Sequence, residues 1–149
     1  MNEEYCNLIY NKILKYIVEP LVGNKTTYMS DLEKVGKKML GQKFLGVYPS
    51  DKIPTLKNHE YAILNLDKSN ESGSHWVAIA KIKNKTHFYD SFGRKDINII
   101  KSLKYSGNGK IINTDNDAEQ KKEEMNCGAR CIAWLILFDK WGSTCADMI

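Results

Sequence analysis

The feature that most constrains the fold is an apolar run near the end of the chain, from Cys127 to Trp141. The run contains no proline and, after Gly128, no glycine. Apolar residues occupy nearly every position, which predicts a buried helix and not a helix with one solvated face. A polar, acidic segment at 114–125 precedes it and predicts a loop. The sequence therefore places an abrupt loop-to-helix junction at Cys127.

The centre of the chain is rich in strand patterns. Residues 61–66 (YAILNL) are typical of a buried strand, and 75–82 (HWVAIAKI) with 86–92 (THFYDSF) have the pattern of a hairpin. A short strand is also predicted at 110–113. Helical spacing of apolar residues predicts helices in three further segments: residues 5–18, ending near Pro20, residues 30–40 and residues 95–104.

Two local expectations concern the region before the first clear strand. Ser30 and Glu33 have the S-x-x-E spacing of a capping box, which marks a helix start. Residues 44–54 are broken by Gly46 and two prolines, and are predicted to be irregular.

Together these elements predict an α+β fold, with helices flanking a small, mainly antiparallel sheet. The 149 residues suit one domain, and the sequence shows no internal repeat and no linker. We therefore expect a single domain over residues 1–149. Its 42% of hydrophobic residues can form a core without disulfides.

Charge and cysteine content narrow the class of protein. The net charge of +4 is too small to indicate a nucleic-acid-binding protein by itself. The first residues lack a signal-peptide pattern, and the longest apolar stretch is too short to span a membrane. We therefore expect a reducing compartment, in which the four cysteines are thiols and not disulfides. The CxxxC spacing of Cys127 and Cys131 has no second ligand pair nearby, so a zinc site is not expected.

Cys127 is a candidate nucleophile because of its place at the predicted helix start. Unpaired N–H groups and the helix dipole favour a thiolate there, and the thiolate is the reactive form of cysteine. The alternative is a buried cysteine that packs as a small hydrophobic residue, and this residue alone favours that alternative.

His75 is the best-placed base, because it opens a predicted strand directly after a loop. Asp90, at the end of the next strand, could orient its imidazole. If the hairpin loop is 81–84, His75 lies opposite Asp90; if the loop is Asn84 and Lys85, His75 faces position 94. The sequence leaves both registers open.

The other two histidines are weaker candidates. His59 lies in a loop-like context without a clear partner. His87 lies three residues before Asp90, which places the two side chains on opposite faces of a strand.

Gln120 is a candidate oxyanion donor. It lies seven residues before Cys127, and its side-chain amide could join the Cys127 N–H in a two-donor oxyanion hole. The alternative is a solvated loop glutamine. Trp76, next to His75, either packs against the imidazole or is a core aromatic residue.

Taken in order, these residues resemble a clan of cysteine proteases whose site residues run His, Asp or Glu, Gln and Cys. This clan contains the adenovirus-type maturation endopeptidases (adenain-like) and the SUMO- and ubiquitin-like-specific proteases. The matching motifs are His75-Trp76, Asp90-Ser91, Gln120 and Cys127-Gly128. The segment 44–54 is similar to the one before the histidine strand of adenain, so the resemblance extends over most of the chain.

The resemblance implies an adenain/papain-like fold with the catalytic cysteine at the N-terminus of the buried helix. It implies a viral endopeptidase, from a virophage, a Polinton-like element or another DNA virus, that cleaves capsid or other virion precursors. Such an enzyme would work as a monomer in the virion and the host-cell interior. It would need no metal and no obligatory cofactor, although adenain is stimulated by a peptide and by DNA. Trp76 would lie on the substrate-binding side.

Two alternatives remain open. One is an isopeptidase of the same clan that removes SUMO- or ubiquitin-like tags. The other is a non-catalytic basic module that binds DNA or a capsid, with a phosphate track formed by lysines: Lys81, Lys83, Lys85, Lys121 and Lys122.

Overall fold

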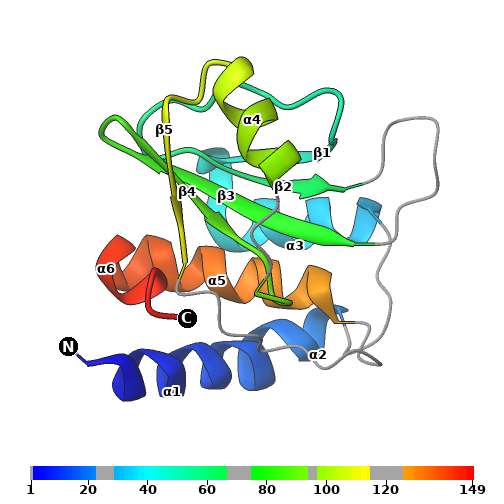
Figure 1. Ribbon diagram of the computed structural model, residues 1–149. Coiled ribbons are helices and arrows are strands. Elements are labelled where there is room, and N and C mark those ends of the chain that lie inside the picture. Colours follow the sequence, from blue (N-terminus) through cyan, green and yellow to red (C-terminus); the bar gives the residue numbers. More distant parts are fainter. Residues whose placement is uncertain (1, 23–28, 67–74, 94–96, 115–125) are drawn as a thin grey trace.

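The computed structural model describes residues 2–22, 29–66, 75–93, 97–114 and 126–149 (Figure 1). They form an α+β fold around a five-stranded sheet with the order β1-β2-β3-β4-β5. The strands are β1 (Phe44–Pro49), β2 (Tyr61–Asn65), β3 (Trp76–Ile82), β4 (Lys85–Tyr89) and β5 (Lys110–Asn113).

The sheet is mixed, so the prediction of a mainly antiparallel sheet is wrong. The inner pairs, β2–β3 and β3–β4, are antiparallel, whereas the outer pairs, β1–β2 and β4–β5, are parallel. The reason lies in the connections between strands. A tight turn can only reverse the chain, but the segments that precede β2 and β5 are long enough to cross back to the starting edge.

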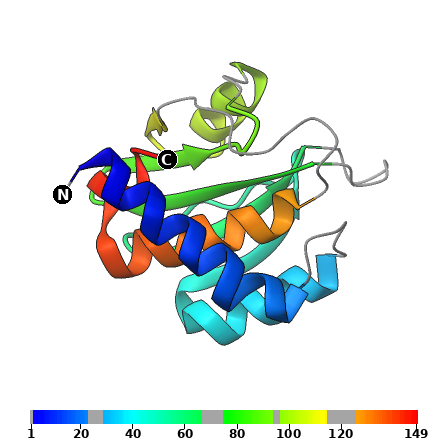
Figure 2. The same cartoon turned by 90° about the horizontal axis from the view of Figure 1, so that it is seen from below.

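Helices cover both faces of the sheet (Figures 1 and 2). On one face, α5 packs on β3 and α3 on β1, and α1 packs on the side of α5 that faces away from the sheet; α4 lies on the opposite face. The helices are α1 (Glu3–Ile13), the π-helical turn η1 (Leu14–Val18), α2 (Glu19–Val22), α3 (Met29–Leu40), the 3₁₀ turn η2 (Gly41–Lys43), α4 (Ile97–Tyr105), α5 (Cys127–Trp141) and α6 (Ser143–Ala146).

Two hydrophobic clusters, one on each face, follow from the alternation of side chains along the central strands. In β2, Tyr61 and Ile63 pack toward α5, whereas Ala62 and Leu64 pack toward α4. Helix α5 has the predicted bounds, and every residue from Cys127 to Phe138 is buried. The prediction of a buried helix is therefore confirmed.

The first helix continues past Pro20, where the sequence predicted its end. The chain runs from α1 through η1 into α2, and the Glu19 N–H donates to the Leu14 carbonyl, five residues back. This π-helical turn changes the hydrogen-bond ladder just before Pro20, which has no N–H to donate. A helix can therefore pass a proline that would otherwise end it.

One further expectation is wrong, and another is correct only in part. Helix α3 begins before Ser30, and the Glu33 carboxylate accepts a hydrogen bond from the Val47 N–H (3.2 Å) and does not form a capping box. The predicted irregular structure is found at residues 50–54, whereas residues 44–49 form strand β1. The pairing of β1 shifts between Phe44 and Val47, around Gly46 with its φ of 139°, so the irregularity is contained within the strand.

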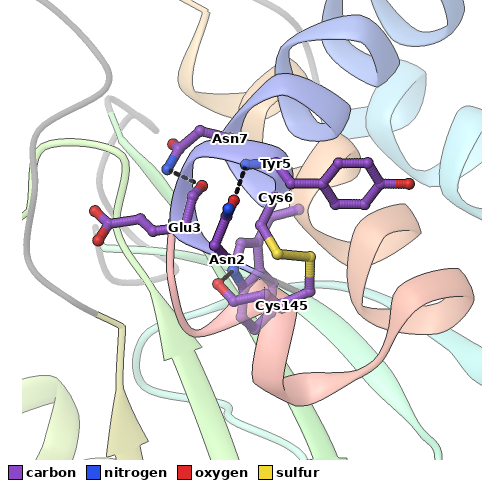
Figure 3. Close-up of a disulfide and its surroundings, with 8 residues drawn as sticks. Asn2, Glu3, Tyr5, Cys6, Asn7 and Cys145 are labelled. Atoms are coloured by element: carbon purple, nitrogen blue, oxygen red, sulfur yellow. Dashed lines mark hydrogen bonds between the residues drawn. A yellow bond between two sulfur atoms is a disulfide. The ribbon is translucent and has the colours of Figure 1, made fainter.

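The expectation that all four cysteines are thiols is also wrong. Cys6 in α1 and Cys145 in α6 form a disulfide, with their Cα atoms 5.4 Å apart (Figure 3). Cys127 and Cys131 are free. The compartment expected from the sequence does not indicate which cysteines the fold brings together. Among the described residues, no helix is long and apolar enough to cross a membrane.

Candidate active site

Three of the predicted site residues meet at one edge of the sheet. His75 immediately precedes β3 and Asp90 immediately follows β4. Because these two strands are antiparallel, the start of β3 and the end of β4 lie at the same edge. Helix α5 packs on β3, and its first residue, Cys127, hydrogen-bonds the His75 side chain.

The hairpin register is neither of the two that the sequence allowed. Ile82 pairs with Lys85 across a two-residue turn, and Ala80 pairs with His87. Both predicted registers are therefore wrong by two residues, in opposite directions. If the observed register continues, Phe92 lies opposite His75, and their rings are 4.7 Å apart.

Asp90 reaches His75 along a diagonal. It lies two residues before Phe92, and a shift of two residues keeps a side chain on the same face. The His75 Nε2 and Asp90 Oδ1 atoms are 2.8 Å apart. Oδ1 also accepts a hydrogen bond from the Phe92 N–H (2.9 Å), which fixes the carboxylate at the end of the strand.

The electrostatics of His75 favour its protonated form. Burial has the largest single effect and lowers the pKa of the imidazole. Hydrogen bonds with Asp90 and with Cys127, and the negative charges of both, act in the other direction and raise the pKa above its ordinary value. Since Nε2 is held by Asp90, Nδ1 is the nitrogen left for the thiol. Such an imidazole can take a proton from the thiol while its other nitrogen stays fixed.

The two free cysteines differ in their surroundings. Cys127, beside His75, keeps 6% of its surface exposed, whereas Cys131, one turn further along α5, has none. Burial raises the pKa of the Cys131 thiol well above its ordinary value, and the negative charges of Cys127 and Asp90 add to this effect. The structure therefore separates a thiol next to a base from a thiol kept protonated by its environment.

A buried polar cluster behind Cys127 was missed by the sequence analysis. Arg130 is buried on α5, and its Nε donates to Asn126 Oδ1 (3.2 Å). Its Nη1 donates to the Tyr10 hydroxyl (3.3 Å), which lies 2.7 Å from the Tyr89 hydroxyl. One signal was present in the sequence, because Arg130 is a charged residue inside an otherwise apolar run.

Gln120 and Trp76 are the other two residues that the sequence placed in the site. Gln120 lies outside the described residues, so its predicted role in oxyanion binding stays a prediction. Trp76 is buried in the hydrophobic cluster on the α5 face, and the ring against His75 is that of Phe92. The predicted substrate contact of Trp76 also stays a prediction.

The remaining histidines lie elsewhere in the fold. His59 occupies a turn, with a φ of 62°. His87 is buried on β4, and its Nδ1 lies 2.9 Å from Asp147 Oδ1. Neither histidine lies with His75, Asp90 and Cys127.

No group of three or more His, Cys, Asp and Glu side chains within the described parts of the chain is arranged to hold a metal ion. In comparisons with known proteins, no protein-family model matches the sequence, and no curated protein matches it significantly.

Proposed function

We propose that the protein is a cysteine endopeptidase with Cys127 as nucleophile, His75 as general base and acid, and Asp90 as the group that orients the imidazole. The observation that carries this proposal is the His75 side chain, which hydrogen-bonds Asp90 on one side (2.8 Å) and Cys127 on the other. A thiol, an imidazole and a carboxylate in this order form the arrangement that activates a nucleophile for acyl transfer.

The reaction follows from the positions of these groups. His75 takes the proton of the Cys127 thiol, and the sulfur forms a bond to the scissile carbonyl carbon. When the tetrahedral intermediate collapses, the carbon–nitrogen bond breaks and the leaving amine takes the proton from His75. Water, deprotonated by the same imidazole, then hydrolyses the thioester and releases the acid product and the free thiol.

The developing oxyanion needs hydrogen-bond donors. The first N–H groups of a helix have no acceptor within the helix, so the Cys127 N–H at the start of α5 is one available donor. By resemblance to the adenain-like proteases, we propose Gln120 as the second donor.

The resemblance also supplies the proposed biology. The substrates would be capsid or other virion precursors, read as extended peptides with small residues near the cleaved bond. The enzyme would act as a monomer in the virion and the infected cell, with a peptide or DNA as a stimulating partner.

One experiment tests the catalytic assignment. The protein is incubated with a peptide library rich in glycine, and the rate of Cys127 alkylation is measured in parallel. We expect hydrolysis that is lost in Cys127→Ala and His75→Ala. Cys131→Ala is the matched cysteine control and His87→Ala the matched histidine control, and both should keep the activity. Hydrolysis that survives Cys127→Ala would reject the proposal. An absence of hydrolysis, with Cys127 alkylated no faster in the wild type than in His75→Ala, would also reject it.

A second candidate function rests on the lysines at the opposite end of the hairpin. Lys83 lies in the turn, Lys85 pairs with Lys110, and a loop carrying Lys57 adjoins the turn through a hydrogen bond from the Lys83 N–H to Asn58 Oδ1. These exposed lysines could bind phosphates. Incubation with virion precursor and with a ubiquitin-like fusion, each with and without DNA, separates endopeptidase, isopeptidase and DNA-binding module.

A further inference from the structure

We propose that Tyr10, on the N-terminal helix, is a positioning residue for the candidate active site. With Arg130 and Tyr89, it ties together the two elements that carry Cys127 and Asp90. This inference rests on the proposed function, because it concerns the alignment of the same thiol and carboxylate.

The hydroxyl of Tyr10 joins three elements of the fold. Tyr10 is fully buried on α1, and its oxygen lies 2.7 Å from the hydroxyl of Tyr89 at the end of β4. The same oxygen accepts a hydrogen bond from Nη1 of Arg130 on α5 (3.3 Å). The two tyrosine rings meet edge to face, with centroids 6.2 Å apart. One hydroxyl group thus links α1 to both elements of the site.

On the α5 side, the link reaches the residue before the nucleophile. The Arg130 Nε donates to Asn126 Oδ1 (3.2 Å), and the Arg130 N–H donates to the Asn126 carbonyl (3.0 Å). Within the described residues, the Asn126 side chain makes no capping hydrogen bond to α5, so it serves the guanidinium instead. A buried guanidinium requires hydrogen-bond acceptors, which makes the position of Asn126, and hence of Cys127, depend on this cluster.

On the sheet side, the link reaches the residue before the carboxylate. Tyr89 is the last residue of β4, and its ring stacks on Trp134 of α5 at an interplanar angle of 5°. Asp90 follows directly, and its carboxylate holds His75 at 2.8 Å. A displacement of the Tyr89 hydroxyl therefore shifts the backbone that carries Asp90.

Helix α1 is itself anchored close to Tyr10. Cys6 lies four residues earlier, on the same buried face of the helix, and its disulfide to Cys145 attaches α1 to α6 (Figure 3). Figure 2 shows α1 lying across α5. The disulfide fixes the position of α1 along its own axis, and therefore the place at which Tyr10 contacts Arg130.

The test removes the hydroxyl and keeps the ring. In Tyr10→Phe we expect kcat to fall about tenfold, which corresponds to ~1.4 kcal/mol, with KM little changed, because the ground-state peptide contacts are untouched. The pH profile of Cys127 alkylation should shift as well, since it reports the His75–Cys127 pair without any substrate. Tyr5→Phe is the matched control, because Tyr5 lies on the same helix with 47% of its surface exposed.

Two further measurements make the outcome decisive. Tyr89→Phe removes the other hydroxyl of the pair, and the double variant with Tyr10→Phe should lose no more activity than either single variant. Wild-type kcat and a wild-type alkylation profile in Tyr10→Phe would overturn the positioning role. A wild-type protein that hydrolyses no peptide, and whose Cys127 is alkylated no faster than in His75→Ala, would instead reject the proposed function. In that case an alkylation profile unaffected by Tyr10→Phe would overturn the positioning role too.

Discussion

The disulfide between Cys6 and Cys145 should make the stability of the fold depend strongly on redox conditions. The two cysteines are 139 residues apart in the sequence. In the chain-entropy model, closing a loop of that length removes roughly 17 cal/mol/K of entropy from the unfolded chain, which is about 5 kcal/mol at 25 °C. Native disulfides commonly contribute about 2–4 kcal/mol. We therefore expect reduction to lower the free energy of unfolding by about 2–5 kcal/mol, a large part of the ~5–15 kcal/mol typical of a domain.

Urea unfolding followed by tryptophan fluorescence measures this difference. The wild type is compared with and without reductant, at the same protein concentration and pH. With a urea dependence of about 2 kcal/mol per molar, the midpoint should fall by roughly 1–2.5 M on reduction. The control is the double variant Cys6→Ala/Cys145→Ala, whose midpoint should be low already and should not respond to reductant.

A thiol count checks the premise separately. The unfolded but unreduced wild type should have two reactive thiols, those of Cys127 and Cys131. A count of four would refute the pairing itself. A count of two, with the same urea midpoint in oxidised and reduced protein, would refute the loop-closure reasoning and leave the pairing intact.

Two other predictions concern His75 and a close packing contact. Burial lowers the pKa of His75, but its hydrogen bonds with Asp90 and Cys127 raise it above the ordinary value, so the folded state binds the proton more tightly than the unfolded state. The contribution of this proton to the free energy of unfolding is present below about pH 6.5 and is lost as pH rises through the folded-state pKa. Urea unfolding of the wild type should show the free energy of unfolding declining over this range, by at most ~1.4 kcal/mol per pH unit. The decline should be absent in His75→Asn. A Cβ at Gly36 would clash with the Phe44 ring, so Gly36→Ala should lower the free energy of unfolding by about 1–3 kcal/mol despite the better helix propensity of alanine. In a Phe44→Leu background, urea unfolding should show a smaller loss from Gly36→Ala. An equal loss from Gly36→Ala in the wild-type and Phe44→Leu backgrounds would contradict the packing argument.

Helix α5 shows what the sequence could predict well. Its limits, Cys127 and Trp141, follow from local information, because a mostly apolar run without proline begins after a polar segment and ends before Gly142. The burial of the helix follows from the same run, since it offers no polar face to water. The nucleophile candidate could be found for this reason, as its position depends only on where the helix starts.

Features that depend on distant segments could not be predicted in the same way. Four cysteines allow six different single disulfides, and only the docking of α1 beside α6 selects Cys6 with Cys145. The cluster of Tyr10, Tyr89 and Arg130 likewise joins residues from three separate elements. Strand β1 was missed for a local reason, because Gly46 resembles a breaker in sequence although the strand accommodates it as a shift in pairing.

In the hairpin of β3 and β4, His75 and Asp90 lie on one face although both predicted registers are wrong. Val77 and Ile79 pack on one face of β3 and Ala78 on the other, so the strand is buried on both faces and its apolar pattern does not specify a register. The turn sets the register instead, with Lys83 at a φ of 56°. The sequence's two registers and the observed one differ by steps of two residues, and each step preserves the face. His75 and Asp90 are therefore on one face in all three, and only the structure could show that the diagonal brings them to hydrogen-bonding distance.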